Sequence, residues 1–244
     1  MQTLIKRSRR LRSGIVVVRP DFETATKYGQ YYEKLYVIGA AEKNGIPYVD
    51  LYGADACKAK FRSYVSSPLV VFISGTGHGN PTTFTGQNYE YLLVKGYRED
   101  AGLMKGKWGS FLSCSFGQSA DWWVEAGMLG FFGYNRTYYF MAGVYPDSRA
   151  KYFYDSHHAF NVAVLNGCSW RDAFNACKAA YDRAMVDAPY DVKYYLKWDR
   201  DSMVVKGAMD DGPFVRRVEP NWWCRFLKWL CETSGCPGKI CGGG

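Results

Sequence analysis

The 244-residue sequence lacks any apolar run near the roughly 18 residues that a membrane-spanning helix needs. The apolar stretch at 15–18 is also far shorter than the hydrophobic region of a secretion signal. There is no internal repeat and no low-complexity tract. With 48% hydrophobic and 22% charged residues, the composition excludes a disordered chain, a coiled coil and a collagen-like fibre. We therefore expect a folded, cytoplasmic protein.

Aromatic residues and positive charge are both abundant. The sequence is 17% aromatic, with 20 Tyr and 8 Trp, which is more than a core needs and favours an aromatic groove or partner surface. The net charge of +8 favours acidic partners. A basic arm at 1–13 can contact nucleic acid or an anionic membrane surface, although a solvated run of charge is the favoured interpretation. Its cations are Lys6, Arg7, Arg9, Arg10 and Arg12.

The cysteines fall into two groups. Without a secretion signal, a disulfide framework is not expected, so four of them are predicted to be free thiols: Cys57, Cys114, Cys168 and Cys177. The other four crowd the C-terminal end, where they can hold zinc, form one or two disulfides or remain free thiols: Cys224, Cys231, Cys236 and Cys241. Their spacing is wider than in the usual zinc knuckles. A Trp-rich amphipathic helix at 221–232 is expected to dock on the body of the protein or on a membrane surface.

Strand and helix signals alternate along the chain. The β-branched run at 15–18 predicts a buried strand, and apolar residues at helical spacing predict a helix over 24–43 that stops at Asn44-Gly45. Similar patterns predict further strands at 47–52, 69–73, 108–112 and 128–132, a hairpin at 83–94, and helices at 54–65, 120–126, 148–165 and 170–186. This order predicts an α/β fold with a mainly parallel sheet covered by helices on both faces.

Three regions follow from these patterns. The basic arm at 1–13 precedes a sheet domain at 14–190. Because the periodicity weakens after residue 187, the segment 191–244 is expected to be a small, Cys- and Trp-rich C-terminal subdomain.

Reactive side chains follow two of the predicted strands. In a parallel sheet, the loops after the strands meet at one edge, where sites form. The strand at 69–73 leads to His78, and the strand at 108–112 leads to Cys114. A histidine can take the proton of a neighbouring thiol and later protonate a leaving amine. The glycines beside His78 and the backbone N–H of Cys114 suit an oxyanion hole.

Less specific interpretations compete with this one. A single cysteine after a strand is usually a small buried apolar side chain, and a histidine in a glycine-rich turn can simply cap its loop. The occurrence of both at one predicted sheet edge favours the catalytic hypothesis. His157 and His158 lie inside a predicted helix away from this edge, so packing or surface roles are favoured for them.

Three motifs occur in a recognisable order: Val70 to Gly79 ending in His-Gly, Phe111 to Gly117 containing Ser-Cys, and Glu125 to Gly133. Together they resemble the caspase–haemoglobinase fold of cysteine peptidases, in particular its gingipain-type branch. The segment 165–174 is similar to the helix–Gly–helix segment of that branch, and the resemblance covers about residues 14–186. It implies a caspase-like three-layer αβα sandwich.

The same resemblance implies that His78 is the general base and acid, Cys114 the nucleophile and Gly79 an oxyanion contributor, with no cofactor required for catalysis. Two features depart from related families. Leu112 and Ser113 precede Cys114, so the caspase pentapeptide is absent and cleavage after Asp is not implied. Leu112 also stands where metacaspases carry an acidic residue, so their pocket for basic residues is not implied either.

Candidate pocket residues follow from position alone. Asp21 and Asp147 can supply a carboxylate for a Lys or Arg substrate, or can cap helices. Asn135 and Arg136 follow the fifth predicted strand and are expected to help line the crevice, where Arg136 would suit an acidic group.

The sequence therefore predicts a cysteine endopeptidase that hydrolyses protein or peptide substrates through an acyl-enzyme on Cys114. The alternative is a non-catalytic, caspase-like binding or structural module of a larger assembly. A nucleic-acid-binding role of the basic arm is a third hypothesis, which predicts a steep dependence on salt.

Overall fold

The computed structural model describes residues 13–141, 143, 145 and 147–215. Its main sheet has six strands in the order β2-β1-β3-β7-β8-β9. The first five are parallel, and β9 is antiparallel to β8. The strands are β1 (Gly14–Arg19), β2 (Tyr48–Tyr52), β3 (Val70–Thr76), β7 (Trp108–Leu112), β8 (Gly130–Tyr134) and β9 (Met203–Gly207). The five predicted strands are all present, although β8 begins at Gly130 rather than at 128.

The helices also follow the predicted pattern. The long helix expected at 24–43 consists of α1 (Thr24–Tyr32), a π-helical segment η1 (Glu33–Ile38) and α2 (Gly39–Asn44). It ends at Gly45, whose φ of 61° lies in the left-handed region that favours glycine. The remaining α-helices are α3 (Lys58–Val65), α4 (Arg98–Met104), α5 (Ala120–Glu125), α6 (Ala150–Leu165), α7 (Trp170–Asp187) and α8 (Tyr190–Ser202). Short 3₁₀ turns are η2 (Gly53–Asp55), η3 (Gln87–Tyr89) and η4 (Phe116–Ser119).

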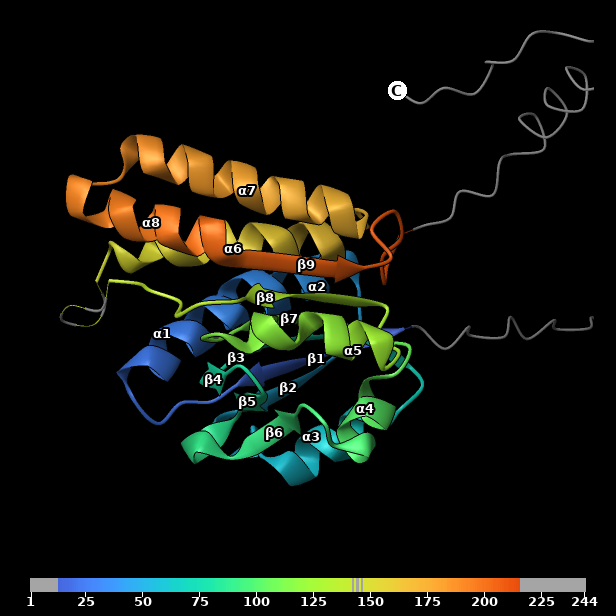
Figure 1. The fold of residues 1–244 in the computed structure, drawn as a ribbon. Helices are drawn as coiled ribbons and strands as arrows, with labels where there is room; N and C mark the ends of the chain where they lie inside the picture. The colour runs from blue at the N-terminus through green and yellow to red at the C-terminus, as the bar shows by residue number, and fades with distance from the viewer. Residues whose placement is uncertain (1–12, 142, 144, 146, 216–244) are drawn as a thin grey trace, which may run out of the picture.

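The main sheet is covered on both faces. In β1, Ile15 and Val17 pack in a core with residues of α1, η1 and α6, whereas Val16 and Val18 pack in a second core with residues of α3 and α5. A strand that is buried along its whole length requires such cover on both sides. Figure 1 shows α6, α7 and α8 on one side and α3 on the other. The three-layer αβα sandwich is therefore confirmed.

A small antiparallel sheet extends from the end of β3. It consists of β4 (Gly79–Asn80), β5 (Thr83–Thr85) and β6 (Tyr91–Val94), and it contains the predicted hairpin. Phe84 of β5 is fully buried in the core beside α3 and α5. This packing anchors the small sheet, and through Gly79 it anchors the turn that carries His78.

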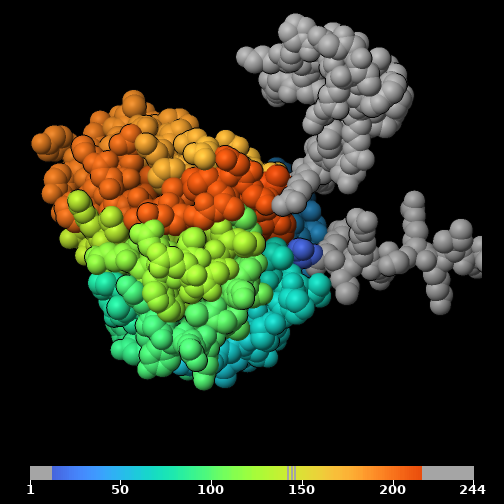
Figure 2. All heavy atoms as spheres, turned by 45° about the vertical axis from the view of Figure 1, so that its right-hand side comes forward, coloured from blue at the N-terminus to red at the C-terminus, as the bar shows by residue number. Residues whose placement is uncertain are grey.

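The boundary predicted after residue 190 needs correction. Val192 and Leu196 of α8 are fully buried in the same core as α6 and α7, and β9 pairs with β8 from Met203 to Gly207. On the face that Figure 2 shows, the orange and red part of the chain lies directly on the green part. The sheet domain thus continues to Gly207. The prediction missed this because β9 is an edge strand of partly buried residues without a clear alternation.

Several predictions concern parts of the chain that the structure does not describe. The basic residues at 1–12, the Trp-rich segment and the four C-terminal cysteines lie outside the described residues. The other four cysteines are free thiols, as expected. Of the helices that the structure describes, none combines the length and the apolar character that crossing a bilayer demands.

Candidate active site

His78 and Cys114 follow neighbouring parallel strands. Thr76, the last residue of β3, is the register partner of Leu112, the last residue of β7. The N–H of Gly77 donates to the carbonyl oxygen of Leu112 at 3.2 Å, so the pairing continues into the turns. His78 and Cys114 therefore occupy equivalent positions at the carboxyl edge of the sheet.

The two turns pack together at a distance that only glycine permits. A Cβ on Gly79 would lie 2.8 Å from Ser113 Oγ and 2.9 Å from the carbonyl oxygen of Cys114. A Cβ on Gly77 would lie 2.2 Å from the carbonyl oxygen of Thr85. Gly79 thus allows the turn of His78 to sit directly against the turn of Cys114, and Gly77 allows it to sit against β5.

The His78 side chain is held by a carboxylate and an aromatic ring. Its Nε2 lies 3.0 Å from Glu23 Oε1, and its ring centroid lies 4.8 Å from that of Tyr89. The carbonyl oxygen of His78 accepts hydrogen bonds from Thr85 N at 2.9 Å and Thr85 Oγ1 at 3.0 Å. Backbone and imidazole are both fixed as a result.

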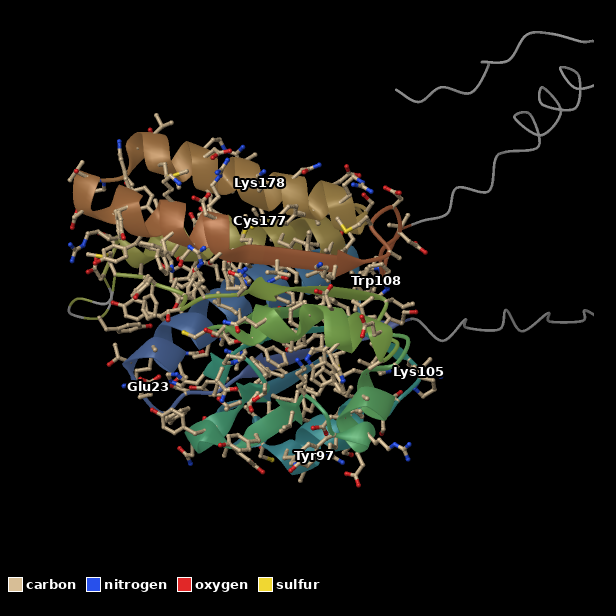
Figure 3. The ribbon with its side chains drawn as sticks, in the orientation of Figure 1. Glu23, Tyr97, Lys105, Trp108, Cys177 and Lys178 are labelled. Carbon is tan, nitrogen blue, oxygen red and sulfur yellow. The ribbon has the colours of Figure 1, made fainter. Side chains whose placement is uncertain are left out.

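Glu23 is a site residue that the sequence reasoning missed. It is the N-cap of α1, where its Oε1 accepts from Thr26 N at 3.1 Å while Thr26 Oγ1 accepts from the N–H of Glu23. This reciprocal cap is a signal in the sequence, because Glu23 and Thr26 stand three residues apart at the start of a predicted helix. Figure 3 labels Glu23 at the start of α1 and Trp108, the first residue of β7, toward the opposite end of the sheet.

The surroundings of the Cys114 thiol raise its pKa above the ordinary value. Burial is the main reason that the pKa of Cys114 is raised. The thiol also donates a hydrogen bond to the carbonyl oxygen of Tyr138, at an Sγ–O distance of 4.0 Å. Burial therefore favours the neutral thiol over a preformed thiolate at this site.

Unusual backbone conformations surround the two side chains. Among the described residues, the non-glycine residues with positive φ are Asn88 (51°), Tyr89 (62°) and Ser115 (60°). Tyr89 contacts the His78 ring, and Ser115 directly follows Cys114. Such conformations cost about 1–3 kcal/mol each and concentrate at functional sites.

A cavity of about 220 Å³ is lined by both His78 and Cys114. His78, Cys114 and the ends of β3 and β7 form part of its wall, and Ala25 contributes from α1. Three aromatic residues complete the lining, namely Tyr138, Phe140 and Tyr154. The sequence reasoning did not find this aromatic wall, because its members come from an irregular segment and from a helix far along the chain.

The two aspartates predicted for a substrate pocket are engaged elsewhere. Asp21 Oδ2 accepts from the Tyr52 hydroxyl at 2.7 Å. The Arg149 guanidinium lies 2.7 Å from Asp147 and holds the pKa of this carboxyl down at about 2. Neither aspartate lines the cavity that His78 and Cys114 share, so the expected placement of a carboxylate there is corrected.

Asn135 and Arg136 support the cysteine turn from outside the cavity lining. The carbonyl oxygen of Arg136 accepts from Ser115 N at 2.8 Å, and its guanidinium lies over the Trp198 ring at 5.1 Å. The N–H of Asn135 donates to the carbonyl oxygen of Ser202 at 2.9 Å. The cation–π contact keeps the Arg136 side chain on α8, where it does not meet a group in the cavity.

No protein-family model matches the sequence, and neither does any curated protein sequence. Solved structures do match. The complex of the pro- and mature domains of Porphyromonas gingivalis RgpB has a TM-score of 0.56 at 10% identity, covering 84% of this chain and 48% of that chain. The Arg-specific cysteine proteinase gingipain R (RgpB) has a TM-score of 0.54 at 10% identity, covering 82% and 47%.

A third structure, described as a protease, has a TM-score of 0.50 at 13% identity, covering 85% of this chain and 49% of that chain. This chain therefore spans about half the length of the structures that it matches. Identities this low show similarity of fold. The chain has the caspase–haemoglobinase fold of the gingipain-type cysteine peptidases, as the motifs around His78 and Cys114 implied.

Proposed function

We propose that this protein is a cysteine endopeptidase, with Cys114 as the nucleophile and His78 as the general base and acid. The observation that carries the proposal is that both residues line one cavity at the ends of two paired parallel strands. The fold shared with gingipain R supports it.

The proposed reaction has two stages. Cys114 Sγ attacks the peptide carbonyl carbon while its proton passes to His78. The C–N bond then breaks, and His78 protonates the leaving amine, which leaves a thioester on Cys114. Water attacks the thioester, His78 accepts a proton from that water and returns it to sulfur, and the carboxylic acid product leaves. Because burial raises the pKa of Cys114, the thiol loses its proton during the attack rather than before it.

Glu23 positions the imidazole in this scheme. Its carboxylate accepts a hydrogen bond from Nε2–H of His78, which leaves the lone pair of Nδ1 for the thiol proton. The carboxylate also stabilises the imidazolium that forms when the proton arrives. The backbone N–H groups of Gly79 and Cys114 are the proposed oxyanion donors, and the close packing of these two turns supports that pairing. The thiol and the imidazole supply the nucleophile and the proton carrier, so the proposed reaction uses no cofactor.

The cavity favours a peptide with a large apolar side chain at the cleaved residue. The described residues that line it include three aromatic rings and no carboxylate. A buried Lys or Arg head group would find no opposite charge there, whereas an apolar side chain gains about 25 cal/mol for each Å² that it removes from water.

The decisive experiment measures cleavage of a quenched fluorescent peptide library by the purified full chain. We expect Cys114→Ala and His78→Ala to abolish turnover. Cys57→Ser is the matched control, because Cys57 is a free, partly exposed thiol at the N-cap of α3. Cleavage that survives in the Cys114→Ala variant would refute the proposal.

A non-catalytic binding or structural module is the second candidate. The raised pKa of Cys114 and the hydrogen bond of its thiol to the carbonyl of Tyr138 favour this alternative, because an inert cysteine has these properties. The alternative predicts that the wild-type chain binds peptides without cleaving them.

A further inference from the structure

A second group of reactive side chains lies outside the cavity of His78 and Cys114. Glu33, His157 and His158 are fully buried, and each has a potential ligand atom within 4.8 Å of those of the other two. None of the three lines that cavity. Carboxylate and imidazole groups rarely share a dry interior unless something binds them.

Two elements far apart in the sequence supply these side chains. Glu33 is the first residue of η1, the π-helical segment that joins α1 to α2, and π-helical turns occur frequently at functional sites. His157 and His158 are consecutive in α6, which packs against this segment. Their ring centroids lie 4.9 Å apart, and the ring planes meet at 78°.

Each imidazole is held at one nitrogen and unpaired at the other. His157 Nδ1 lies 2.9 Å from the Tyr134 hydroxyl, and His158 Nδ1 lies 3.1 Å from the Asn161 side-chain amide. In the described structure, the Nε2 atoms of both histidines are buried without a hydrogen-bond partner. An outer partner that fixes one imidazole nitrogen while the other remains available is the usual arrangement around a metal-binding histidine.

Tyr134 and Asn161, the partners of the two Nδ1 atoms, can leave the lone pair of each Nε2 atom available to a metal ion. The Tyr134 hydroxyl can accept from Nδ1–H of His157 while it donates to the Tyr181 hydroxyl 2.9 Å away. The Asn161 amide can present its oxygen to Nδ1–H of His158 after a half-turn, and that oxygen is otherwise buried without a partner. Both tautomers that metal binding requires are therefore compatible with the packing.

Glu33 is held in a comparable way. Its two carboxylate oxygens lie 3.2 Å and 3.0 Å from Ser74 Oγ, and the side chain is fully buried. Ser74 belongs to β3, so the carboxylate is oriented by the main sheet on one side and faces α6 on the other. A bound cation would stabilise the ionised form of this buried carboxyl group.

We propose that Glu33, His157 and His158 bind one divalent transition-metal ion, with Zn²⁺ as the ion whose preferences this donor set fits. Two imidazoles and one carboxylate form a known zinc ligand set, in which a water molecule completes the four-coordinate geometry. The ion joins η1 to α6 and so links two helical elements that cover the same face of the sheet. Because the site lies in the core, its role is structural, and it is independent of the proposed peptidase reaction.

Zinc binding to the C-terminal cysteines must be separated from binding at this site. The test therefore uses the full-length chain in which serine replaces all four of them: Cys224, Cys231, Cys236 and Cys241. After treatment with a chelator, this protein is titrated with Zn²⁺ by calorimetry and with Co²⁺ by absorption spectroscopy. We expect one ion per chain, a visible Co²⁺ spectrum typical of nitrogen and oxygen ligands, and a higher melting temperature with Zn²⁺.

Glu33→Gln and His158→Gln keep the size of a polar side chain but remove a ligand, and each is expected to weaken Zn²⁺ binding at least tenfold. His78→Ala is the matched control, because it removes the remaining histidine of the sequence and is expected to leave binding unchanged. Unchanged Zn²⁺ affinity in folded Glu33→Gln and His158→Gln proteins would overturn the proposal. If these variants do not fold, the absence of a Co²⁺ spectrum in the parent protein overturns it as well, and a buried water is then the occupant.

Discussion

Thr76 and Leu112 are register partners at the ends of β3 and β7, and this pairing places His78 beside Cys114. Each reactive residue stands two positions beyond the end of its strand. A shift of the β3–β7 pairing by one residue would therefore move His78 and Cys114 apart. Gly79, which follows His78, then allows the two turns to touch. The geometry of the candidate site is therefore a direct consequence of strand register.

The first prediction concerns Glu23. Glu23→Gln removes the charge that orients and stabilises the His78 imidazolium, so kcat/KM should fall about 10- to 100-fold. The effect is moderate because the Glu23 side chain is 33% exposed and solvent screens its charge. Steady-state kinetics measure it, with Glu90→Gln, an exposed glutamate next to Tyr89, as the control. Equal kinetics for the two variants would remove Glu23 from the mechanism.

The second prediction concerns the reactivity of the thiol. Because burial raises the pKa of Cys114, its alkylation by iodoacetamide should accelerate with pH throughout the alkaline range. Mass spectrometry assigns the label to Cys114 and separates it from Cys57 and Cys168, the other partly exposed thiols of the described structure. A plateau of the rate below neutral pH would instead indicate a preformed thiolate–imidazolium pair.

The third prediction tests the close contact between the two turns. Gly79→Ala places a Cβ within 2.9 Å of both Ser113 Oγ and the Cys114 carbonyl, so we expect about 1–3 kcal/mol of destabilisation and at least a tenfold loss of activity. Gly102→Ala is the matched control, since a Cβ there meets nothing within 4 Å. Denaturant unfolding and peptide cleavage measure the two effects. A fully active Gly79→Ala variant would show that the turns are not coupled.

The fourth prediction concerns the cleaved residue. The aromatic wall of Tyr138, Phe140 and Tyr154 should favour Phe or Leu over Arg at the cleaved position by about tenfold or more, because transferring a large apolar side chain from water contributes about 1.5–3 kcal/mol. Cleavage rates of three peptides that differ only at this residue provide the measurement. A preference for Arg would show that a carboxylate reaches the cavity after all.

The fifth prediction concerns acid stability. Arg149 depresses the pKa of Asp147 to about 2, so the ionised carboxylate stabilises the fold above the ordinary pKa of about 4, and this stabilisation is lost as the pH falls toward 2. Asp147→Asn should therefore lower the melting temperature at neutral pH, by a small amount because Arg149 is 40% exposed. The difference between wild type and variant should disappear near pH 2. A difference that persists there would assign the effect to packing.

Much of the fold could be predicted because its signals are local. The run at 15–18 indicated a strand buried on both faces, and Asn44-Gly45 indicated the end of the long helix. The positions of His78 and Cys114 after two such strands indicated a shared edge. The strand β9 had no comparable signal, since an edge strand of partly buried residues shows no clear alternation.

The sequence by itself determined the alternation of strands and helices and the two turns that carry His78 and Cys114, because spacing between neighbouring residues encodes both. Only the tertiary structure decided that Glu23 contacts His78 and that Tyr154 lines the cavity. It also decided that Glu33 lies close to His157 and His158. These groups are far apart along the chain, and their distances depend on how whole helices pack on the sheet. No local pattern records that packing, because it results from the burial of all the layers together.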